Sequence, residues 1–80
     1  MHRAQETIRV SYSYMRGGPL GCVTVTREYD SSRLRLPIRE GQSRMQAACD
    51  AARALMLASG AQHVECVRGD KGNELTVYHS

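Results

Sequence analysis

Residues 41–60 carry the one sustained helical pattern in this chain, and this pattern most constrains what the chain can fold into. Apolar side chains recur there at intervals of three and four residues, which places them along one stripe of an α-helix. The stripe consists of Met45, Ala48, Cys49, Ala52, Leu55 and Met56. Ser43 can cap the first turn, and Gly60 can adopt the left-handed conformation that ends the last one. Because most of these side chains are small, we expect the helix to pack closely against a sheet.

Alternating apolar and polar residues predict five strands around this helix. Three precede it, at 7–15, 22–29 and 33–38, and two follow it, at 62–68 and 74–79. The residues expected to point inward are Ile8, Val10, Tyr12, Tyr14, Val23, Val25, Tyr29, Leu34, Leu36, Ile38, Leu75 and Val77. In the fourth strand either Val64 and Cys66 or His63 and Val67 point inward. Arg27 falls on the apolar face, close enough to the strand end for its head to reach water.

Turn signals separate the strands. Glycine and proline cluster at 16–21, Asp30 begins a polar turn, and 69–73 reads G-D-K-G-N. Residues 1–6 are polar, and we expect them to be loose. The order is therefore β-β-β-α-β-β in a single domain over 1–80. This order predicts an α+β fold, an antiparallel sheet of about five strands with one helix packed on one face.

One face of such a sheet has no helix to cover it. The side chains expected there or in its loops are polar or charged, namely Arg9, Ser11, Ser13, Thr24, Thr26, Glu28, Asp30, Arg33 and Arg35. Two interpretations remain open. An antiparallel sheet can keep a polar face in water, or the arginine and hydroxyl side chains can form a platform for a partner.

The 80 residues carry a net charge of +3, from eleven basic against eight acidic side chains. This balance permits contact with nucleic acid without requiring it. The chain has no Phe or Trp, so its core is small, and a partner or a homodimer through a sheet edge would add burial.

The predicted location is the cytoplasm. Three cysteines, at 22, 49 and 66, form no C-x-x-C pair, which favours reduced thiols. No apolar run has the length of a membrane span, and the first residues lack the apolar segment of a signal peptide.

No set of residues indicates catalysis, so the chain is not expected to be an enzyme or to hold a cofactor or a metal. His63 and Cys66 are three apart in a predicted strand, and their side chains therefore point to opposite faces. Nucleic-acid binding is the more serious alternative, because Arg33, Arg35, Arg39 and Arg44 cluster before the helix. Against it, the tyrosines at 12, 14 and 29 fall on the face predicted to be buried, where bases cannot stack on them.

From Tyr12 to Leu57 the chain resembles the later part of a double-stranded-RNA-binding domain. The resemblance rests on G-G-P-L-G at 17–21 and on G-x-S-R-x-x-A-x-x-A-A-x-x-A-L at 41–55. Arg44 matches the first position of that family's lysine cluster, whereas Met45 and Ala48 occupy the other two. The family's first helix has no counterpart here, and two strands follow where that fold ends.

In size and element order the whole chain is similar to the small anti-CRISPR proteins of phages that act on type I systems. That resemblance implies a binding protein in the host bacterial cytoplasm. It would inhibit a CRISPR surveillance (Cascade-type) complex by protein–protein contact, blocking target DNA binding or nuclease recruitment. The implied partner is a protein subunit of that complex, met through the uncovered face and its loops.

Overall fold

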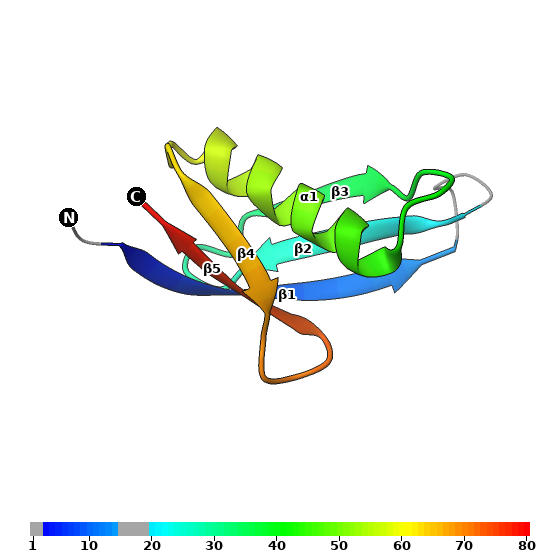
Figure 1. Ribbon diagram of the computed structural model, residues 1–80, viewed down its shortest axis with the longest axis horizontal. Coiled ribbons are helices and arrows are strands. Elements are labelled where there is room, and N and C mark those ends of the chain that lie inside the picture. Colours follow the sequence, from blue (N-terminus) through cyan, green and yellow to red (C-terminus); the bar gives the residue numbers. More distant parts are fainter. Residues whose placement is uncertain (1–2, 15–19) are drawn as a thin grey trace.

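The computed structural model describes residues 3–14 and 20–80 as a five-stranded antiparallel sheet with one helix on one face (Figure 1). The elements are β1 (Ala4–Ser13), β2 (Cys22–Arg27), β3 (Arg33–Pro37), α1 (Arg44–Ala58), β4 (Val64–Arg68) and β5 (Glu74–His79). In space the strands lie in the order β3-β2-β1-β5-β4, so the last strand of the chain is inserted beside the first. The predicted α+β fold and its element order are confirmed.

The core lies between the sheet and α1. The sheet contributes Ile8, Val10, Val23, Val25, Leu75 and Val77, and the helix contributes Ala47, Ala48, Ala51, Ala52, Leu55 and Met56. The buried helix face differs slightly from the predicted stripe, because Ala47 and Ala51 are buried whereas Met45 and Cys49 are half-buried. Four alanines on this face allow the helix backbone to approach the sheet closely.

Both predicted helix ends are present. Ser43 Oγ accepts a hydrogen bond from the Gln46 amide at 3.1 Å, and the Gln46 side chain accepts one from the Ser43 amide at 2.8 Å. This capping box satisfies two of the free amides of the first turn. Gly60 has φ +101°, the left-handed conformation expected after the last turn.

The first strand begins three residues earlier than its alternation indicates. Ala4, Gln5 and Glu6, expected to be loose, pair with His79, Tyr78 and Val77 of β5. They are ordered because β5 lies beside β1, an arrangement that a local pattern does not reveal. The same pairing places Val64 and Cys66 of β4 on the helix side, since Cys66 lies opposite Val77, and this decides between the two predicted alternatives.

Two tyrosines predicted to be inward are exposed. β2 ends at Arg27, so Tyr29 lies in the following turn with 79% of its surface exposed. Tyr14 follows the end of β1 and is 67% exposed. Met15 and most of the loop predicted at 16–21 fall outside the described residues.

The close approach of α1 can be tested at Ala51, which is fully buried. Replacing Ala51 by Leu inserts three carbon atoms where the helix meets the sheet, and we expect a loss of about 1–3 kcal/mol in the free energy of unfolding. Ala58→Leu, at an exposed position of the same helix, is the control and should leave stability nearly unchanged. Urea unfolding followed by circular dichroism measures both, and an Ala51→Leu protein as stable as the control would refute the close packing.

Candidate functional site

The face of the sheet opposite α1, here called the outer face, brings together most of the predicted partner-binding residues. The strand register aligns Ser11 with Thr24 and Arg35 in one cross-strand row, and Arg9 with Thr26 and Arg33 in the next. A further row joins Ser13, Cys22 and Pro37. The β1–β2–β3 half of this face therefore presents hydroxyl groups flanked by guanidinium groups.

The charges of this half are predominantly positive. Arg9 Nε lies 3.9 Å from Glu28 Oε1, and both side chains are at least half exposed, so this ion pair contributes little to stability. Arg35 Nε lies 3.0 Å from the sulfur of Cys22. Arg33 is exposed and has no carboxylate within ion-pair distance among residues 3–14 and 20–80.

The outer face continues over β5 and β4, which the sequence analysis did not assign to it. Gln5 lies opposite Tyr78, and Thr7 lies opposite Thr76, which in turn lies opposite Val67 of β4. The guanidinium carbon of Arg3 lies 5.4 Å from the centre of the Tyr78 ring. The sequence contains a signal for the β5 residues, because side chains that alternate with the inward Leu75 and Val77 must point outward.

The predicted nucleic-acid cluster is not brought together. Arg33 and Arg35 lie on the outer face, whereas Arg44 lies on the helix side of the sheet. Arg39 borders a shallow hollow beside α1 that Gln42 and Asp50 also line. These arginines therefore form separate surfaces.

Arg44 makes its own aromatic contacts. Its guanidinium carbon lies 5.2 Å from the ring centres of both Tyr12 and Tyr14, distances typical of a cation–π contact. The Tyr12 hydroxyl also donates a hydrogen bond to the Arg44 carbonyl at 3.3 Å. The exposed ring of Tyr14 thus lies beside the Arg44 cation at the start of α1. Burial of this tyrosine therefore no longer argues against the binding of nucleic acid.

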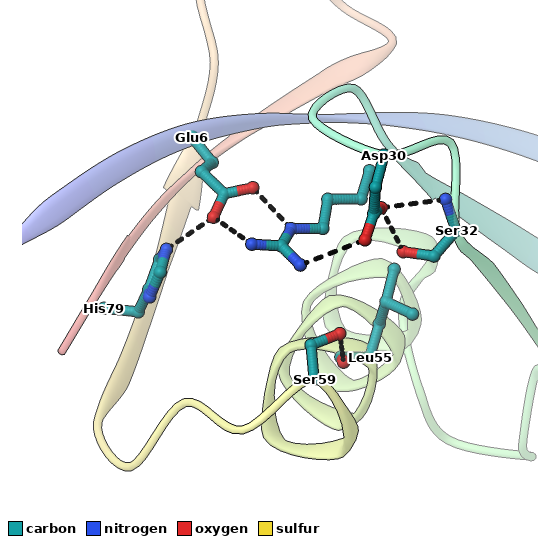
Figure 2. A network of polar contacts seen from close by, with 7 residues as sticks. Glu6, Asp30, Ser32, Leu55, Ser59 and His79 are labelled. Carbon is teal, nitrogen blue, oxygen red and sulfur yellow. Dashed lines mark hydrogen bonds and ion pairs between the residues drawn. The ribbon is translucent and has the colours of Figure 1, made fainter.

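Asp30 does not belong to the outer face either. It lies at the edge of a polar network on the helix side, which Figure 2 shows. Arg27 forms two hydrogen bonds of 2.6 Å with the Glu6 carboxylate, and His79 contacts the same carboxylate from β5. Asp30 lies 3.4 Å from Arg27 and accepts hydrogen bonds from the amide and hydroxyl of Ser32.

This network joins three neighbouring strands. The side chains of Arg27 and Glu6 are only 12% and 13% exposed, so the prediction that the Arg27 head reaches water is wrong. The hydrogen bonds from Arg27 are the main reason that the pKa of Glu6 is lowered, and those to Glu6 raise the pKa of Arg27. The Tyr29 ring covers the guanidinium at 4.8 Å. We interpret the network as structural, because it connects β1, β2 and β5.

Among residues 3–14 and 20–80, no three His, Cys, Asp or Glu side chains converge as a metal site would require. In the same part of the chain, no helix has both the length and the hydropathy of a membrane span. No family model matches the chain, and neither the curated proteins nor the solved structures give a significant match to it.

Replacing Arg27 by Met leaves the Glu6 carboxylate buried without its main partner, and we expect a loss of about 2–3 kcal/mol in the free energy of unfolding. Because an apolar pair can fill the same space without a desolvation cost, Glu6→Leu combined with Arg27→Met should recover most of that loss. Urea unfolding of the two single variants and the double variant forms the cycle. Strictly additive losses would show that the two side chains do not stabilise each other.

Proposed function

We propose that this protein is a binding protein that docks its outer face onto the surface of a larger protein. The observation that carries the proposal is the arrangement of Arg9, Arg33 and Arg35 around hydroxyl side chains on a sheet face that no helix covers. A face that contacted only water would not need an excess of positive over negative side chains. The excess of positive charge favours an acidic patch on the partner.

The area of the outer face is too small to form a specific interface by itself. Five strands spaced about 4.8 Å apart, with about six residues each, give a face of roughly 24 by 20 Å. That area is about 500 Å², whereas a specific interface buries about 800 Å² on each partner. Loops at the sheet ends must therefore join the contact.

The partner we propose is a type I CRISPR surveillance complex, on the strength of the resemblance in size and element order to small anti-CRISPR proteins. A protein of this size acts there by occupying a surface that the complex needs for target DNA or for its nuclease. Steric occlusion requires no catalytic group and no cofactor. An arrangement of rigid strands suits that role, because little conformational entropy is lost on binding.

The test combines the purified protein with a type I surveillance complex and measures both complex formation and target-DNA binding. We expect the unmodified protein to co-elute with the complex and to lower its DNA binding or its recruitment of nuclease.

A pair of variants tests which surface binds. Arg33→Glu with Arg35→Glu should weaken co-elution by at least tenfold. Arg53→Glu with Arg68→Glu makes the same change in net charge at exposed positions away from the outer face, and should bind as the unmodified protein does. Absence of co-elution with every type I complex tested would remove this partner, and equal weakening by both pairs would remove the outer face.

A second function is favoured by one specific observation, the exposed Tyr14 ring beside Arg44 at the start of α1. Aromatic rings and arginines of this kind stack on unpaired bases and contact phosphates in single-strand binders. This alternative is a small RNA- or DNA-binding module.

If it holds, single-stranded oligonucleotides should bind with an affinity that falls steeply as salt rises. Tyr14→Ala should weaken binding by about 1–3 kcal/mol. Arg44→Ala should reduce the salt slope by about one ion, and Arg33→Ala serves as the matched control on the opposite face. No binding at about 50 mM salt, or equal effects of Arg44→Ala and Arg33→Ala, would exclude the module.

A further inference from the structure

Three sulfur atoms meet between α1 and the edge strand β4. Cys66 Sγ lies 3.3 Å from Cys49 Sγ, and Cys49 Sγ lies 4.0 Å from Met45 Sδ. Met45 and Cys49 are one turn apart on α1, and Cys66 points toward them from the inward face of β4. Both cysteines are free thiols, and all three side chains are half-buried. The cluster is therefore shielded from bulk water but open to a small ion.

We propose that this cluster binds Cu(I), with the two cysteine thiolates and the methionine thioether as ligands. Soft sulfur ligands select Cu(I) over the other common metal ions. Zinc is a poor match, because its sites use at least three protein ligands drawn from thiolate, imidazole and carboxylate, and this cluster has two. Neither imidazole nor carboxylate completes this cluster within residues 3–14 and 20–80. Spacing along the strand relates Cys66 only to His63, on the opposite face, whereas folding places Cys66 against Cys49.

The two sulfur–sulfur distances that involve Cys49 are close to those around a three-coordinate ion. At a metal–sulfur distance of about 2.3 Å, three ligands around one ion lie about 4 Å from one another. Cys49 and Met45 already have this separation, at 4.0 Å. The two thiols, at 3.3 Å, must move apart by about 0.7 Å. Small rotations about their χ1 angles provide that movement.

Proton release accompanies binding. Burial, with the neighbouring Cys49 thiol, raises the pKa of Cys66 to about 12, so Cys66 keeps its proton in the absence of metal. A Cu(I) ion bound by both sulfurs as thiolates gives a bis-thiolate complex with a net charge of −1, and the thiol protons are released to solution. The nearby positive charge of Arg53 favours the thiolate form of Cys66 and partly offsets this charge.

The experiment titrates fully reduced protein with Cu(I) under anaerobic conditions, in competition with the chromogenic chelator bicinchoninate. We expect one Cu(I) per chain and release of two protons per ion, measured with a pH indicator. Cys49→Ser and Cys66→Ser should each lower the stoichiometry from one to zero. Met45→Leu, which keeps the volume and removes the sulfur, should weaken the affinity at least tenfold.

Cys22→Ser is the matched control, because Cys22 lies on the outer face beside Arg35, away from the cluster. It should retain one Cu(I), with far-UV circular dichroism confirming the fold of each variant. The proposal is overturned if the unmodified protein binds no more copper than Cys49→Ser, or if Cys22→Ser loses copper equally. It is also overturned if the thiols only form a disulfide under a mild peroxide and hold no Cu(I) when reduced. Should Cys66→Ser fail to fold, Cys49→Ser and Met45→Leu decide the outcome.

Discussion

The close packing of the alanine face of α1 on one side of the sheet is the contact on which the rest of this structure depends. Among the described residues one helix covers the sheet, so most of the large apolar side chains of the strands point to that side. A chain without Phe or Trp fills its core with valine, leucine and alanine. Alanines at the contact bring the helix backbone near the strands, so these small residues still make a continuous core. The opposite face must then be compatible with water or with a partner.

At the end of the core near the last helical turn, a partly buried ion pair replaces apolar packing. In Figure 2, Glu6 and Asp30, the two carboxylates that contact Arg27, lie near the last turn of α1, where the Ser59 hydroxyl donates a hydrogen bond to the Leu55 carbonyl. Charged groups are costly in such a place unless they are paired and hydrogen-bonded. Here the Glu6 carboxylate accepts two hydrogen bonds from Arg27 of β2 and contacts His79 of β5. The ion pair and its histidine neighbour therefore connect strands that are distant in sequence.

The sequence predicted those parts of the structure that local patterns determine. The helix, its caps and the five strands follow from periodicity, and the composition of the outer face follows from alternation. It did not predict contacts that depend on which strands become neighbours. Glu6 was expected to be loose because its partners Arg27 and His79 lie 21 and 73 residues away. The contact of Cys49 with Cys66 was missed for the same reason, and Tyr29 was misplaced because β2 ends two residues before it.

In the function proposed above, one side of the sheet builds the core and the other binds a partner, and cross-linking to a type I surveillance complex tests that division most directly. A photoreactive amino acid would be placed at Thr24, in the middle of the outer face, or at Leu57, on the exposed side of α1. After irradiation, covalent adducts with subunits of the complex are identified by mass spectrometry. The account predicts adducts from position 24 and none from position 57. Adducts from position 57 alone would contradict it.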